Sequence, residues 1–184
     1  MPMLLSNQQK EILRLLRTFG KMKAEQVQQL LAFRFPPESV RLEPMLRQLH
    51  YGGLIRRDGR YVALPGSRPK DPAMGDALDI MLLLAPGGVQ AFHTGTPPFI
   101  LTFFRDRGNK LYRYDICPVS LIRLPVVCAQ LEGIRSKYRV VILQLLDMGL
   151  KDIHRAAHLD IPCEYCFALK TDEGVRFYKK ERMK

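Results

Sequence analysis

The sequence contains no apolar run that approaches the roughly 20 residues needed to cross a lipid bilayer. Its longest apolar stretch, residues 80–85, fits the end of an amphipathic helix instead. The opening segment, MPMLLSNQQK, is too short and turns polar too early for a secretory signal peptide. We therefore expect a cytoplasmic protein that has no membrane partner.

Cysteine is scarce, with 4 residues in a chain of 184. These thiols do not make a dense disulfide framework for this length, so a reducing compartment is the default expectation. The sequence also has no glycine-rich phosphate loop and no serine-centred nucleophile elbow. The absence of these motifs leads us to expect no cofactor and no enzymatic activity.

Acidic residues are outnumbered, with 18 Asp and Glu against 29 Lys and Arg, giving a formal net charge of +11. Such a charge favours an acidic partner, most commonly nucleic acid. Residues 1–65 hold eleven of the basic residues and five of the acidic ones, so +6 of the net charge of +11 lies in about a third of the chain. Hydrophobic residues make up 47% of the chain, which is typical of a globular protein.

Helical spacing of apolar residues predicts three helices near the start of the chain. Ser6 is placed to cap the first helix, with Gln9 as its capping-box partner, and Gly20 ends it. A second helix is predicted over residues 23–31. A third follows Leu42, Met45, Leu46 and Leu49, and starts near Glu43 because Pro44 is tolerated only in a first turn.

A β-hairpin is predicted over residues 54–64, with Asp58-Gly59 as its two-residue turn. Three helices followed by a hairpin is the order of a winged helix-turn-helix domain, here over residues 1–65. In such domains the third helix enters the major groove. The predicted DNA-binding residues are Arg41, Arg47, Gln48, Arg56, Arg57 and Arg60.

Two carboxylates, Glu38 and Glu43, argue against this interpretation because they would repel phosphate. They leave open a second hypothesis, in which the winged helix binds a protein and no longer binds DNA. The hairpin arginines could also serve only to keep the hairpin solvated.

Residues 66–72 form a polar, proline-rich linker and the expected domain boundary. The stretch 73–184 alternates helical and extended patterns in the order α-β-β-β-α-β-α-β-β. This order predicts a second, α/β domain with a mixed sheet, and the fold class of the whole chain is α+β or α/β. Residues 138–145 (YRVVILQL) form a largely apolar run, which predicts a strand buried on both faces.

The N-terminal stretches QQKEILRLLRTFGKMKAEQVQQLL and LRQLHYGGLIRRDGRYVAL resemble the winged helix of the replication-relaxation family. Those proteins are encoded by plasmids and conjugative elements of Gram-positive bacteria. The resemblance implies a role in replication, transfer or regulation of a mobile element, and a partner protein from that element. It also implies a C-terminal domain similar to the restriction-endonuclease-like fold, often without its active site.

A metal-dependent nuclease is the third hypothesis. It requires an acidic residue near one strand and an acidic-x-Lys pair on the next. Asp115 is the best-placed acid, but the run YRVVILQL carries no matching acid and lysine. We therefore interpret Asp115 as a strand-end or capping carboxylate.

A zinc site is the remaining metal hypothesis, drawn from the pattern H-x3-H-x4-C-x2-C formed by His154, His158, Cys163 and Cys166. Two imidazoles and two thiolates can close a tetrahedral site. A spacing of three along a strand points the two cysteines to opposite faces, so buried thiols and surface imidazoles are the preferred interpretation. Cys117 and Cys128 are expected in the core.

The sequence thus predicts a non-enzymatic protein that binds double-stranded DNA through its first 65 residues. A homodimer is expected because helix-turn-helix modules usually gain affinity by pairing half-sites.

Overall fold

The computed structural model describes residues 4–67, 71–147 and 161–179. The chain divides into two compact units, Met1–Gly88 and Val89–Lys184. We call them the N-terminal unit and the C-terminal unit. Among the described residues, every helix is too short or too polar to span a bilayer.

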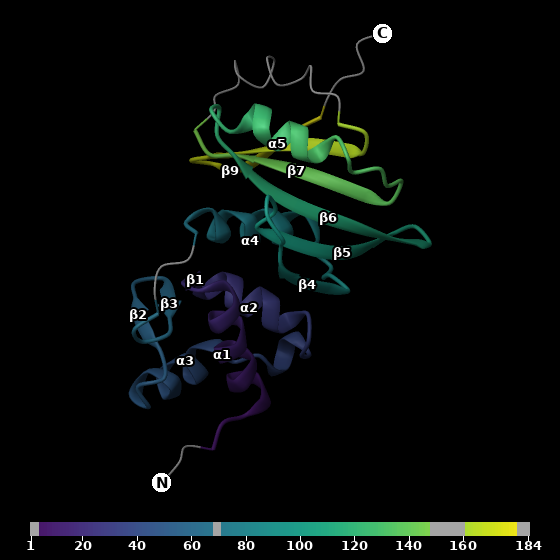
Figure 1. Ribbon diagram of the computed structural model, residues 1–184. Helices are drawn as coiled ribbons and strands as arrows, with labels where there is room; N and C mark the ends of the chain where they lie inside the picture. The colour runs from purple at the N-terminus through teal and green to yellow at the C-terminus, as the bar shows by residue number, and fades with distance from the viewer. Residues whose placement is uncertain (1–3, 68–70, 148–160, 180–184) are drawn as a thin grey trace. The chain divides into compact units, whose positions relative to one another are not determined.

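The N-terminal unit contains four α-helices and a small antiparallel sheet, within its described residues (Figure 1). Its elements are α1 (Asn7–Phe19), β1 (Met22–Lys23), α2 (Ala24–Ala32), the 3-10 helix η1 (Pro37–Ser39), α3 (Leu42–Tyr51), β2 (Arg56–Asp58), β3 (Tyr61–Ala63) and α4 (Ala73–Leu84). The sheet order is β1-β3-β2. The predicted succession of three helices and a hairpin is confirmed, whereas the two-residue strand β1 was not predicted.

The start of α1 matches the predicted capping box. The Gln9 backbone N–H donates to Ser6 Oγ at 3.2 Å, and the Ser6 backbone N–H donates to Gln9 Oε1 at 2.9 Å. Two of the orphan donors of the first turn are thereby satisfied. The apolar stripe of α1 is fully buried and forms the core of the unit together with Val27, Leu30, Leu46, Leu49 and Val62.

The turn of the β2–β3 hairpin differs from the prediction by one residue. Asp58 pairs with Tyr61, so the two central residues are Gly59 and Arg60, and the Asp58-Gly59 assignment was wrong. Gly59 has φ +56°, and no described non-glycine residue has a positive φ. A positive φ at the first central residue alone is the pattern of a type II′ turn, which requires glycine only there.

We expect Gly59→Ala to loosen the hairpin, because alanine at this positive φ is strained by about 1 kcal/mol. Hydrogen exchange of the Tyr61 and Val62 amides would report the lower opening free energy. Gly87→Ala is the matched control, since Gly87 is outside the left-handed region and an added Cβ meets nothing within 4 Å. Equal protection in both variants would contradict this account of the turn.

Helix α4 belongs to the N-terminal unit, whereas the sequence placed it after the linker in the second domain. The Ala73 N–H donates to Asp71 Oδ1 at 2.9 Å, so the predicted cap is present. Gln26 Nε2 donates to the Gly75 carbonyl at 2.7 Å and to Asp79 Oδ1 at 2.6 Å, and Lys23 forms an ion pair with Asp79. These polar contacts with Gln26 and Lys23 attach α4 to the N-terminal unit, which therefore reaches Gly88. The spacing of apolar residues in the sequence does not reveal such contacts.

The C-terminal unit is built on a six-stranded sheet in the order β4-β5-β6-β7-β8-β9. Its described elements are β4 (Ala91–Thr94), β5 (Leu101–Arg107), β6 (Lys110–Val119), α5 (Leu124–Leu131), β7 (Arg139–Leu145), β8 (Glu164–Thr171) and β9 (Gly174–Lys179). Strand β7 is parallel to both β6 and β8, and the remaining pairs are antiparallel. The predicted mixed sheet and α+β fold class are confirmed.

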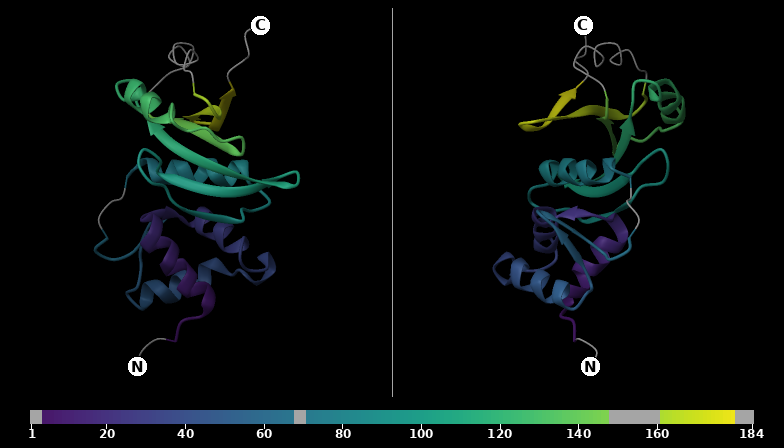
Figure 2. Two further views of the ribbon diagram at one scale, coloured as in Figure 1. Left: turned by 45° about the vertical axis from the view of Figure 1, so that its right-hand side comes forward. Right: turned by 90° about the vertical axis from the view of Figure 1, so that its left-hand side faces the viewer.

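Strand β7 lies in the middle of the sheet between β6 and β8, and Val140 to Leu145 are all buried, as the largely apolar run predicted. Helix α5 lies beside the sheet in both views of Figure 2. Its buried residues Leu124, Val127 and Leu131 pack in one cluster with Val141, Leu143 and Phe167. The short helix predicted over residues 150–158 lies outside the described residues.

Candidate nucleic-acid interface

Helix α3 presents a polar, solvent-exposed side opposite its buried leucines. Arg41 is its N-cap residue and Pro44 lies in the first turn, as predicted. Arg47 and Gln48 follow on the exposed side, with 67% of the Arg47 side chain accessible. The helix therefore does display the residues that were predicted to face a nucleic acid.

Gln48 is held by the N-terminus of α1. Gln9 Nε2 donates to Gln48 Oε1 at 2.8 Å. Bidentate reading of adenine needs both the carbonyl and the amide of a glutamine. With one lone pair of its carbonyl oxygen engaged, Gln48 keeps both of its N–H donors, which suit a phosphate oxygen or a guanine acceptor. Gln9 was predicted only as a capping residue, and its spare amide is the part that sequence reasoning missed.

Arg57 does not extend freely from the hairpin, contrary to its predicted role. Its two terminal nitrogens donate to the two carboxylate oxygens of Glu43 at 2.7 and 3.0 Å. These hydrogen bonds lower the pKa of Glu43 and raise the pKa of Arg57. The pair joins β2 to α3, so Arg57 acts as a clamp, and its positive charge offsets the negative charge of Glu43.

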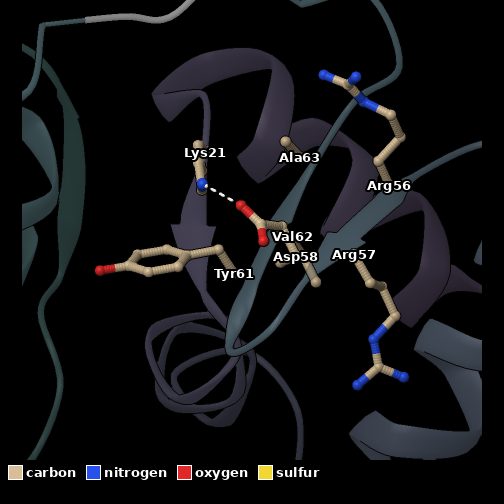
Figure 3. A pocket seen from close by; sticks show the side chains of 7 residues that line it. All are labelled: Lys21, Arg56, Arg57, Asp58, Tyr61, Val62 and Ala63. Carbon is tan, nitrogen blue, oxygen red and sulfur yellow. Dashed lines mark hydrogen bonds and ion pairs between the residues drawn. The ribbon is translucent and has the colours of Figure 1, made fainter.

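Arg56 lies on the other face of the hairpin. Neighbouring strand residues point to opposite faces, and Arg57 pairs with the buried Val62. Figure 3 shows the Arg56 and Arg57 guanidinium groups pointing in different directions. Arg56 is exposed and makes no hydrogen bond or ion pair with another described residue, so its charge is available to a ligand.

The outer face of the hairpin carries a shallow pocket of about 260 Å³, which Figure 3 shows from close by. Lys21 Nζ lies 2.8 Å from Asp58 Oδ2 and 4.6 Å from the centre of the Tyr61 ring. Its hydrogen bond lowers the pKa of Asp58. Arg60, in the turn, also lies over the Tyr61 ring, with its guanidinium carbon 5.3 Å from the ring centre. Lys21 was not predicted, and its partner Asp58 was assigned to the turn.

Four of the predicted arginines thus keep charge that no short ion pair neutralises. Arg41 and Arg56 have no hydrogen-bond or ion-pair partner among the described residues. Arg60 donates only a long hydrogen bond, 3.4 Å, to the Tyr61 hydroxyl, and Arg47 Nε is 3.8 Å from Glu43. Glu38 is exposed in η1. This surface is chemically suited to bind backbone phosphates.

Asp115 is not a strand-end or capping residue, because it lies in the interior of β6 and its side chain is fully buried. Thr102 Oγ1 donates to its Oδ1 at 2.5 Å. Arg113 Nε lies 3.0 Å from Oδ1, and Arg139 Nε lies 2.6 Å from Oδ2. We call these four residues the Asp115 cluster. Three donors therefore already surround the carboxylate that a nuclease would use to hold a cation.

The zinc hypothesis lies partly outside the described residues, since His154 and His158 are not among them. Cys163 is buried in the core cluster before β8, and burial raises its pKa. Burial raises the pKa of Cys166, within β8, to about 11 and that of Cys117 to about 12. In the described part of the chain, no group of three or more His, Cys, Asp or Glu side chains could hold a metal ion.

No protein-family model and no curated protein matches the chain. Two solved structures are weakly similar. The restriction endonuclease FokI bound to DNA is 12% identical, with a TM-score of 0.35, and the match covers 91% of this chain and 44% of that one. Protein VC1899 from Vibrio cholerae is 11% identical, with a TM-score of 0.33, and the match covers 89% of this chain and 54% of that one.

The chain therefore spans about half the length of these two solved chains. The resemblance to the replication-relaxation family stays a prediction.

Proposed function

We propose that the chain is a non-enzymatic protein that binds duplex DNA through α3 and the β2–β3 hairpin. The observation that carries the proposal is the set of exposed arginines without short ion pairs on these two elements, namely Arg41, Arg47, Arg56 and Arg60. Glu43, the acidic residue at the centre of α3's first turn, is covered by Arg57. The interface therefore keeps a positive excess that favours a polyanion.

The non-enzymatic part of the proposal rests on the Asp115 cluster. A hard divalent cation needs carboxylate oxygens that are free to coordinate it. Both oxygens of Asp115 accept hydrogen bonds, and the two arginines beside it would repel a cation. A role in replication, transfer or regulation of a mobile element, with a partner protein from that element, rests on the N-terminal resemblance. A homodimer is expected on the general grounds of half-site pairing.

The test is the salt dependence of binding to a random DNA duplex, followed by fluorescence anisotropy. Four phosphate contacts predict a slope of about −3.6 for log K against log salt. Affinity should therefore fall about a hundredfold between 50 and 200 mM salt. Absence of binding at low salt would overturn the proposal and favour the protein-interaction hypothesis.

A further inference from the structure

We propose that Arg113 and Arg139, oriented by Asp115, form an oxyanion site that binds a phosphoryl group on the C-terminal unit. The site is separate from α3 and the hairpin, and the proposal does not depend on DNA binding there. It rests on the charge balance of the Asp115 cluster and on the way in which the two arginines use their nitrogens.

The charge balance of the Asp115 cluster is positive. Arg113 and Arg139 are register partners on the parallel strands β6 and β7, so two like charges lie side by side. Asp115 is the one described carboxylate within ion-pair distance of either guanidinium. Like charges placed opposite each other in a sheet are destabilising, and one carboxylate neutralises only one of the two. An additional anion would complete the balance.

The arginine geometry leaves donors available for that anion. Both guanidinium groups contact Asp115 through Nε, at 2.8 Å from Oδ2 for Arg113 and 2.6 Å for Arg139. Their terminal Nη groups make no hydrogen bond with any described residue. The Nη edge of an arginine is a planar fork that matches phosphate oxygens, and charge-assisted hydrogen bonds of this kind are short and strong.

The site is both rigid and open to solvent. Arg139 is only 17% exposed, and its guanidinium lies 4.9 Å from the centre of the Phe99 ring. Arg113 is 40% exposed and provides the access. Since Asp115 and Thr102 are fully buried, the guanidinium groups are oriented before a ligand arrives, which lowers the entropic cost of binding.

The ligand class follows from the donor set. Two guanidinium ends present four NH2 groups, and a carboxylate, with two oxygens, can satisfy one such fork. A phosphoryl group offers more oxygens and can engage both. Inorganic phosphate or a phosphorylated small molecule is one source of this group, and the nucleic-acid backbone is the other.

The experiment is a titration of the full chain with inorganic phosphate, followed by NMR of the Arg Nε–Hε resonances. Sodium chloride at equal ionic strength is the reference. Wild type should show saturable shifts at Arg113 and Arg139. Arg113→Gln should weaken the phosphate affinity at least tenfold, measured at the Arg139 signal. Arg123→Gln, which removes an exposed arginine of the same unit, should match wild type.

Arg113→Lys separates recognition from charge, because it keeps the cation and loses the fork, and it should recover only part of the affinity. Arg113→Gln retains the Asp115–Arg139 pair, so we expect the fold to persist. A backbone amide NMR spectrum that matches the wild type away from residue 113 would show this. Two results would contradict the proposed site: sodium chloride produces the same resonance shifts as phosphate, or the Arg139 shift on adding phosphate is unchanged in Arg113→Gln.

The source of the phosphoryl group is distinguished in a second arm. A short DNA duplex is added to a chain in which Arg41, Arg47, Arg56 and Arg60 are replaced by alanine. Shifts at Arg113 and Arg139 with the duplex would assign the site to backbone phosphate. Shifts with inorganic phosphate alone would assign it to a free phosphoryl ligand, whether or not the N-terminal unit binds DNA.

Discussion

Asp115→Ala should destabilise the C-terminal unit by about 3–5 kcal/mol, the cost of breaking a buried ion pair by removing one partner. Without the carboxylate, the guanidinium groups of Arg113 and Arg139 would repel each other across adjacent strands. Thr102 would also lose its acceptor in a fully buried position. Hydrogen exchange of the β6 and β7 amides would measure the loss in opening free energy.

A second variant separates the charge effect from simple truncation. Adding Arg139→Met to Asp115→Ala removes one of the two stranded cations while keeping apolar bulk beside Phe99, and should restore part of the stability. Asp172→Ala is the matched control, because Asp172 is an exposed carboxylate in the β8–β9 turn. If the β6 and β7 amides were as protected from hydrogen exchange in Asp115→Ala as in Asp172→Ala, the Asp115 cluster would not have this stabilising role.

The elements that the sequence predicted correctly are those set by local rules. Ser6 and Gln9 lie three apart and need no distant partner to cap α1. The run that became β7 is apolar from Val140 to Leu143 and again at Leu145, a pattern that favours a strand buried on both faces. Proline is sterically tolerated only in the first turn of a helix, so Pro44 was enough to predict where α3 begins.

The errors arose where a competing local solution or a distant contact decides the structure. Asp58-Gly59 suits a turn with two positive φ angles, yet Gly59 followed by Arg60 makes a turn that needs only one. The fate of Arg57 depends on Glu43, fourteen positions earlier, and no periodicity links the two. The attachment of α4 depends on Gln26 in the same way.

The Asp115 cluster was half visible in the sequence. Arg113 and Asp115 are two apart on a predicted strand, so they share a face, and this spacing could have indicated an ion pair. Arg139 could not have been found, because its place beside Asp115 follows from the parallel register of β6 and β7. Considering Asp115 without these partners led to the interpretation as a strand-end or capping carboxylate, which is wrong.

Replacing Arg41, Arg47, Arg56 and Arg60 together by alanine should lower the affinity for duplex DNA at least about a thousandfold at low salt, since each phosphate contact contributes nearly tenfold at about 0.1 M salt. Anisotropy titrations should also show a salt slope close to zero. All four residues are exposed, so the fold should persist. Arg123→Ala/Arg135→Ala, which removes exposed charge from the other unit, should retain most of the affinity.

Glu43→Gln provides a control of opposite sign. It removes the carboxylate that holds Arg57 and lies near Arg47, so it should raise the DNA affinity about tenfold and steepen the salt slope by about 1. The stability cost should be small, because exposed ion pairs contribute little. If α3 and the hairpin bind a protein instead of DNA, the affinity of the chain for DNA should not depend on these charges. Unchanged DNA affinity in both the alanine and the Glu43 variants would place the binding surface elsewhere on the chain.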